Sequence, residues 1–413
     1  MKNERLFALV GSICLILTLV ALPSGSNCQP KGKPINFGYL EPMTGIFASL
    51  GIGMLDGTRM AVEDVNAQGG ILGRPVQVYY ADSEGSTKVI SERARRLILE
   101  KGVIMVHGEC STALTTALAA TATKHGVIHL NSELDALSPL ANMSKYTFRL
   151  TPHLPSVTRA IARFVKERHP ELKTWAILVP DYAWGHEGAK LFTEAMKGIN
   201  AKTVEVVHPL GAADYSPYIM KILDMKPDGL FSLNWSGDMI AFIKQSKPYG
   251  LYNKVFGFHY GHIVDICATL GKDMVPIWAS LGDAYPLGPD TIEWSKKFHE
   301  RMGYWPKSVY AGNYYDSIFI MKEAMEKANS TEPDKIAKAL KGMRFKGIAG
   351  GKLYIRPESQ LPEKEFVYLG HMAPNPKESP PYFIADDIVK YPFAEVGLTD
   401  EEARKYGCNF PFK

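Results

Sequence analysis

The strongest constraint on the fold is a regular alternation of short apolar runs with amphipathic stretches along residues 35–258. Apolar runs typical of strands lie at 35–40, 76–82, 103–108 and 127–131, and the stretches between them carry apolar residues at helical spacing. A second series with the same order begins after residue 152. Strands that alternate with helices predict parallel sheets covered by helices on both faces. We therefore expect an α/β protein with two sheets in tandem.

The later part of the chain carries too few elements for a third sheet of this kind. The pattern predicts a strand over 277–285, helices over 291–302 and 312–328, and short strands near 352–355 and 366–369. We interpret these elements as completing the two lobes, with the chain crossing between them. Residues 373–413 are rich in proline and aromatic residues, and we expect a C-terminal tail packed on the surface.

The N-terminal residues indicate export. Lys2 and Arg5 precede an uncharged apolar run from Phe7 to Leu22, and small residues follow it. This order is typical of a secretory signal peptide, which we place at residues 1–26. A retained membrane anchor is the alternative, but the run is short for a spanning helix, which needs about 20 residues. A periplasmic protein is expected, and lipid anchoring at Cys28 remains open.

The composition excludes several classes of function. Hydrophobic residues make up 46% of the chain, charged residues 22%, and the formal net charge is only +4, as in an ordinary soluble globular protein. No basic cluster interleaved with aromatic residues points to nucleic acid. The cysteines are widely spaced without a C-x-x-C pair, so we expect neither a zinc site nor a redox motif, and no cofactor.

Three motifs carry a resemblance to a known family. They are the Thr44-Gly45 turn, Gly51, and the run NAQGGILG at 66–73, and the similarity continues through VHGECSTALTT at 106–116 and DYAWGHEG at 181–188 to about residue 370. The chain resembles the type I periplasmic substrate-binding proteins of ABC transporters, of the leucine/isoleucine/valine-binding family. The resemblance implies two Rossmann-like lobes with parallel sheets, joined by three crossovers around a ligand cleft. Lobe 1 would comprise 34–153 plus 284–357, and lobe 2 would comprise 154–283 plus 358–372.

The strand ending at Gly108 and the helix starting near Thr112 place a turn at the edge of lobe 1. Free backbone N–H groups and the positive end of the helix dipole converge there, as in sites that bind carboxylates. From the residues alone, Ser111 and Thr112 either cap the helix or bind a ligand. The resemblance implies that Thr112 holds the ligand's carboxylate. Cys110 in this turn could be a nucleophile only with a histidine base in reach, and we favour a structural role.

The resemblance also implies the remaining residues of the cleft. They are Leu50, Glu133, Leu134, Asp135 and Tyr310 from lobe 1, and Trp184, Trp235 and His259 from lobe 2. Core packing is the alternative for either tryptophan.

At the position of His259, amino-acid binders of this family carry an acid that receives the ligand's ammonium group. A histidine suits a carboxylate, phenol or carbonyl oxygen instead. Asp283 or Glu133 could supply the missing acid, and a loop position outside the pocket is a further alternative for His259.

These features predict capture of a ligand rather than catalysis, and we assign no catalytic residue. The expected protein is a monomeric solute-binding component of an ABC importer that closes its lobes on a small carboxylate-bearing ligand and then docks on a membrane permease complex. Aromatic acids, branched keto acids and branched-chain amino acids are the ligand classes. A sensory module for a small amide or acid, and an exported cysteine hydrolase built around Cys110, are the alternatives.

Overall fold

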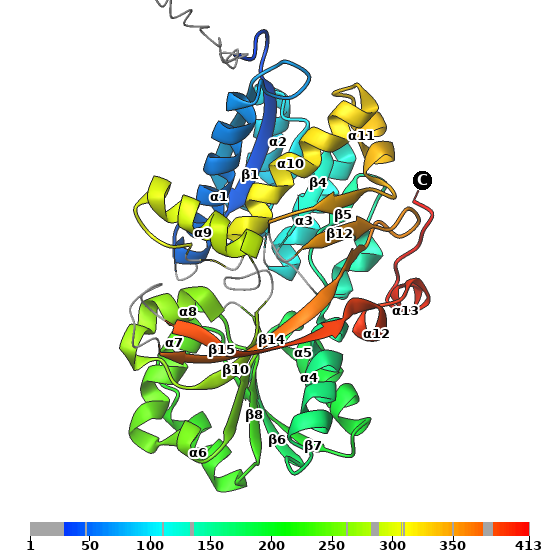
Figure 1. The fold of residues 1–413 in the computed structure, drawn as a ribbon. Coiled ribbons are helices and arrows are strands. Elements are labelled where there is room, and N and C mark those ends of the chain that lie inside the picture. The colour runs from blue at the N-terminus through cyan, green and yellow to red at the C-terminus, as the bar shows by residue number, and fades with distance from the viewer. Residues whose placement is uncertain are drawn as a thin grey trace, which may run out of the picture.

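In the computed structural model the chain forms two lobes, each built on a central β-sheet (Figure 1). The structure describes residues 29–45, 48–109, 111–132, 136–261, 263–281, 289–306, 308, 310–348, 351–374 and 383–412. The expected signal peptide and Cys28 lie outside these residues. Within the described ranges, no helix combines the length and the apolar character needed to cross a membrane.

The sheet of lobe 1 has five strands in the order β2-β1-β3-β4-β5, and all neighbouring strands are parallel. Its strands are β1 (Ile35–Glu41), β2 (Val76–Asp82), β3 (Met105–His107), β4 (Ile128–Asn131) and β5 (Thr147–Arg149). The connecting helices are α1 (Ala48–Ala67), α2 (Thr87–Lys101) and α3 (Thr112–His125), with a 3-10 turn at Ser138–Asn142. Six of the seven residues of β1 are buried, as expected for a central strand covered on both faces.

Three helices from later in the chain complete lobe 1, namely α9 (Pro289–Met302), α10 (Ala311–Ala328) and α11 (Pro333–Leu340). Helices α1 and α10 pack with their backbones in contact, because Gly57 leaves room for a carbonyl: a Cβ there would lie 2.0 Å from the Ala311 oxygen. A small antiparallel sheet follows, formed by β11 (Arg344–Lys346), β12 (Lys352–Ile355) and β13 (Pro362–Lys364).

The sheet of lobe 2 has seven strands in the order β15-β14-β10-β9-β8-β6-β7. The parallel strands are β6 (Thr174–Pro180), β7 (Lys202–His208), β8 (Gly229–Ser232), β9 (Phe256–His259) and β10 (Ile277–Ser280), and β14 (Phe366–Pro374) and β15 (Phe383–Pro392) add an antiparallel edge. The helices are α4 (Leu154–Arg168), α5 (Ala183–Lys197), α6 (Ser216–Met225), α7 (Ser236–Ser246) and α8 (Ile263–Leu270).

The chain passes between the lobes after β5, after β10 and between β13 and β14. The expected α/β class with two Rossmann-like lobes and three crossovers is therefore confirmed. The carboxyl ends of the parallel strands in the two lobes face each other across the region between them (Figure 1). In open α/β sheets this is the side on which ligands bind.

The expectation of a C-terminal tail packed on the surface is wrong for residues 383–412. Strand β15 pairs with β14 along its whole length, and Tyr391, Phe393 and Cys408 are buried. An open edge on β14 would expose unpaired backbone groups, and β15 covers that edge. The proline and aromatic content of this segment hid the alternation that places Val389 and Tyr391 on one face of the strand.

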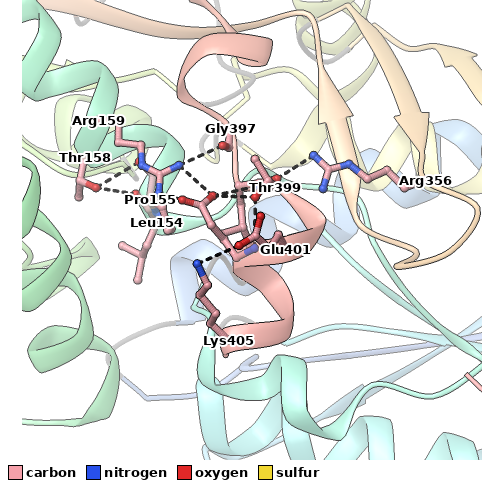
Figure 2. A network of polar contacts seen from close by, with 11 residues as sticks. Leu154, Pro155, Thr158, Arg159, Arg356, Gly397, Thr399, Glu401 and Lys405 are labelled. Atoms are coloured by element: carbon pink, nitrogen blue, oxygen red, sulfur yellow. Dashed lines mark hydrogen bonds and ion pairs between the residues drawn. The ribbon is translucent and has the colours of Figure 1, made fainter. Parts of the chain in front are cut away.

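Residues 393–412, the C-terminal segment, tie the two lobes together. It contains α12 (Phe393–Val396) and α13 (Asp400–Lys405), and arginines from both lobes converge on it (Figure 2). Arg159 of α4 donates to the two carboxylate oxygens of Glu402 at 2.6 and 3.2 Å. Arg356, next to β12, donates to Asp400 at 2.7 Å and to the Leu398 carbonyl at 2.7 Å. The segment therefore adds a connection beside the crossovers.

Candidate functional site

The turn between β3 and α3 lies at the carboxyl edge of the lobe 1 sheet. Gly108 has φ +133, and a Cβ there would lie 2.0 Å from the Leu40 carbonyl oxygen, so only glycine fits. The side chains of Asn131 and Thr115 both donate to the carbonyl oxygen of Glu109, the former at 2.9 Å. These contacts fix the backbone that leads into the first turn of α3.

The two hydroxyl residues of this turn do not cap the helix. Ser111 occupies the N-cap position with extended backbone angles, yet its side chain accepts no capping hydrogen bond. The Oγ1 atom of Thr112 is buried and has no hydrogen-bond partner among the described residues. A buried hydroxyl without a partner is unusual, because it loses its hydrogen bonds to water without replacing them. This geometry favours the binding alternative over simple N-capping.

The interior of lobe 1 next to this turn holds a polar and aromatic cluster. The Nε2 atom of His107 lies 2.8 Å from the Ser132 hydroxyl, and the His107 ring packs 4.2 Å from that of Tyr314. Tyr314 donates its hydroxyl to the buried carboxylate of Glu41 at the end of β1. Burial lowers the pKa of His107 well below its usual value, with a further contribution from His129, so its ring is neutral.

Aromatic side chains gather at the carboxyl edge of the lobe 2 sheet. Tyr182 and Trp184, which follow β6, stack with their ring centroids 6.0 Å apart, and Trp184 meets the edge of Tyr260 at 5.4 Å. The indole N–H of Trp235, which follows β8, donates to the Tyr182 hydroxyl at 2.9 Å. We call these four residues the aromatic cluster. They bring side chains from three neighbouring strand ends to one place.

The local backbone explains why these tryptophans stand where they do. Trp184 lies in the first turn of α5. The next residue, Gly185, lets the helix start close to the end of β6, because a Cβ there would lie 2.2 Å from the Pro180 oxygen. Trp235 is the N-cap of α7. Both indoles are only 5% exposed, so each lies covered within the fold rather than projecting into solvent.

His259 and Tyr310 occupy edges of the two lobes. His259 is the last residue of β9, is fully buried, and lies opposite Ser232 of β8 and Ala279 of β10. It is part of the sheet and not of a loop. Tyr310 is the N-cap of α10 in lobe 1, and its backbone N–H donates to the Ser308 hydroxyl at 3.1 Å.

Several expected site residues belong to parts of the chain that the structure does not describe. Glu133, Leu134, Asp135, Asp283 and Cys110 lie outside the described residues, and Leu50 belongs to α1 with its side chain outside them. Among the described residues, no group of histidine, cysteine and acidic side chains could hold a metal ion.

The sequence interpretation missed other residues at these edges. The carboxylate of Glu41 and the hydroxyl of Tyr314 lie beside the turn before α3, and His208 and Asn234 lie next to Trp235. A polar residue at the end of a strand was the sequence feature that could have identified Glu41 and His208. Tyr314 carries no such signal, because its contact depends on how α10 packs against the sheet.

This two-lobed architecture, with facing sheet edges that carry a hydroxyl pair and an aromatic cluster, is that of a type I binding protein. Residues 34–370 match the family described as periplasmic binding protein, and the chain belongs to that family. The chain is 24% identical over 260 residues to the Leu/Ile/Val-binding protein homolog 4 of Brucella abortus (strain 2308), a match that covers 60% of this chain and 61% of that protein. The chain therefore spans less than two thirds of that relative's length.

Solved structures share the fold across most of the chain. A solute-binding protein of an ABC transporter from Rhodopseudomonas palustris BisB5, in complex with 3,4-dihydroxybenzoic acid, superposes with a TM-score of 0.79 at 21% identity, covering 89% of this chain and 99% of that one. A leucine-binding protein from Thermotoga maritima MSB8 gives a TM-score of 0.75 at 17% identity, covering 86% and 98%.

Proposed function

We propose that the protein is the extracytoplasmic solute-binding component of an ABC importer and that its ligand is a small acid with a flat or branched apolar body. The observation that supports this most is the buried, unpartnered hydroxyl of Thr112 at the start of α3, on the sheet edge that faces the aromatic cluster. A carboxylate at that position would accept from the hydroxyl and from the first N–H groups of the helix.

The aromatic cluster supplies the second half of the proposed site. Trp184 and Trp235 would cover the apolar body of the ligand when lobe 2 rotates onto lobe 1, with Tyr310 completing the wall. Closure would be driven by contacts that the ligand makes with both lobes only in the closed state. The closed protein would then dock on a membrane permease complex as a monomer.

The identity of residue 259 guides the choice of ligand. His259 carries no negative charge to receive an ammonium group, so aromatic acids and branched keto acids are the preferred ligands and α-amino acids are disfavoured. The dihydroxybenzoate complex of the similar Rhodopseudomonas protein makes aromatic acids the first class to test. Family membership also supports binding over catalysis.

A thermal-shift panel on the purified protein tests this proposal. It compares 3,4-dihydroxybenzoate and related aromatic acids with branched keto acids, with leucine, isoleucine and valine, and with small amides. A ligand at 100 times its dissociation constant adds about 2.7 kcal/mol to the free energy of unfolding, which is readily detected. Stabilisation by leucine but by no aromatic or keto acid would contradict the role given to His259, and no stabilisation by any acid would contradict the role given to Thr112.

A further inference from the structure

A buried polar network adjoins Trp235 at the carboxyl edge of the lobe 2 sheet. It consists of His208 at the end of β7, Asn234 after β8, Tyr215 before α6 and Asp238 in the first turn of α7. All four side chains are buried. We call them the His208 network. None of them belongs to the aromatic cluster or to the residues of the proposed site.

The hydrogen bonds of this network can be ordered by their donors and acceptors. The carboxylate of Asp238 accepts from the Gly211 N–H at 2.8 Å and from the Tyr215 hydroxyl. Because Tyr215 donates its only proton to Asp238, its oxygen accepts from the Asn234 Nδ2 group at 3.4 Å. This contact orients the amide, so that Oδ1 of Asn234 faces Nε2 of His208 at 2.9 Å and accepts from it.

The second nitrogen of His208 also faces an acceptor. Its Nδ1 atom lies 2.8 Å from the Pro209 carbonyl oxygen. Both contacts are hydrogen bonds only when both ring nitrogens carry protons, which is the imidazolium form. One charged group and two phenols face the His208 ring. Oδ2 of Asp238 lies 4.0 Å from Nε2. The ring centroids of Tyr215 and Tyr218 lie 5.1 and 5.7 Å from the centroid of the imidazole.

The network continues directly into the backbone of Trp235. Asn234 is its neighbour in the chain, and the backbone N–H of Asp238 donates to the Trp235 carbonyl oxygen at 3.2 Å. Ser236, the next residue, has φ +46, a left-handed conformation that non-glycine residues seldom adopt. Such a conformation persists only where surrounding contacts hold it. The hydrogen bonds of Asn234 and Asp238 lie two residues before and two residues after Ser236.

We propose that the His208 network positions Trp235 for ligand binding. This inference rests on the proposed function, in which Trp235 covers the ligand. When the side-chain hydrogen bonds of Asn234 are lost, the backbone before Trp235 is held less firmly, and the indole of Trp235 is less well placed. The network contacts no ligand itself and acts through Trp235.

The first experiment reads the position of Trp235 without any ligand. The protein is labelled with 5-fluorotryptophan, and the ¹⁹F resonance of residue 235 is assigned with the W235F variant. Asn234→Leu removes both side-chain hydrogen bonds of the amide and should shift or broaden this resonance. Asp228→Asn is the matched control, since that carboxylate accepts from the Lys173 and Thr174 N–H groups at the opposite end of the same sheet, and it should leave the resonance unchanged.

The second experiment measures affinity for 3,4-dihydroxybenzoate. Asn234→Leu should weaken binding about tenfold, equivalent to about 1.4 kcal/mol. His208→Gln keeps a donor for Asn234, so it should retain most of the affinity. His208→Leu has no donor, so it should weaken binding as Asn234→Leu does.

The two experiments separate failure of this inference from failure of the proposed function. A Trp235 resonance that stays unchanged in both Asn234→Leu and His208→Leu overturns the positioning role, whether or not a ligand binds. Wild-type protein that binds no acid of the panel contradicts the proposed function alone, and the ¹⁹F measurement still decides the positioning. If Asn234→Leu does not fold, His208→Leu carries both readouts, with His208→Gln as its conservative control.

Discussion

Replacing Thr112 with valine separates ligand binding from helix capping, because the two roles predict opposite effects on stability. Valine keeps the shape of threonine and removes only the hydroxyl, which is buried and has no partner among the described residues. An unsatisfied buried hydroxyl costs about 1–3 kcal/mol. Thr112→Val should therefore raise the free energy of unfolding of the ligand-free protein by about 1 kcal/mol. A capping hydroxyl would give a loss of about 1 kcal/mol instead.

The same substitution should weaken ligand binding. A hydrogen bond from a hydroxyl to a carboxylate contributes about 1.5–3 kcal/mol, so the dissociation constant of an acid ligand should rise roughly 10- to 150-fold. Urea denaturation without ligand measures the first effect, and isothermal titration calorimetry measures the second. Stability and affinity are then expected to move in opposite directions, which a general disturbance of the fold would not produce.

Thr116→Val is the matched control for this prediction. It is the same substitution one turn further along α3, where the hydroxyl donates to the Thr112 carbonyl at 2.8 Å. The control should leave affinity unchanged. If Thr112→Val lowered the stability and left the affinity intact, the hydroxyl would be a cap and the proposed carboxylate site would be wrong.

Three further predictions concern packing, pH and the C-terminal segment. Gly57→Ala should lower the free energy of unfolding by about 2–3 kcal/mol, because its Cβ would lie 2.0 Å from the Ala311 oxygen. Alanine usually stabilises a helix relative to glycine, so urea denaturation shows which of the two effects is larger. Burial raises the pKa of Asp265 to about 7, so the folded protein keeps a proton that the unfolded chain releases above about pH 4. Stability should fall by up to roughly 4 kcal/mol between about pH 4 and 7, and Asp265→Asn should flatten that fall in denaturation curves recorded across this range. Arg356→Leu should lower the urea midpoint by the equivalent of about 2 kcal/mol at an unchanged m value, since it removes a charge-assisted bond to Asp400.

The α/β class could be predicted from the sequence because strands and helices leave patterns in neighbouring residues. The run WAILVP at 175–180 is apolar throughout, and it forms a strand buried on both faces. Strand β15 was missed because its burial is decided by a distant partner, the open edge of β14. The proline and aromatic residues of 373–413 indicated a tail packed on the surface, since no local pattern records which strand edge remains uncovered.

The candidate site was predictable in part for a similar reason. Ser111, Thr112, Trp184 and Trp235 follow strands that are easily recognised, and the structure places each at a carboxyl edge of its sheet. Their roles as ligand contacts stay a prediction. Tyr314 could not be assigned to this edge from the sequence, because it reaches Glu41 from a helix more than 270 residues later.

The C-terminal segment constrains how the lobes can close. Glu402 is bound by Arg159 of lobe 2, and Asp400 by Arg356 next to the small sheet of lobe 1, so neighbouring residues of one short helix are fixed to opposite lobes. Helices α12 and α13 lie on the side of the molecule where the chain passes from β13 to β14 (Figure 1). A motion that separated the lobes on that side would break at least one of the two ion pairs. Closure by rotation about that side keeps them intact and leaves the movement to the opposite side, so the ion pairs should persist in both the open and the closed protein.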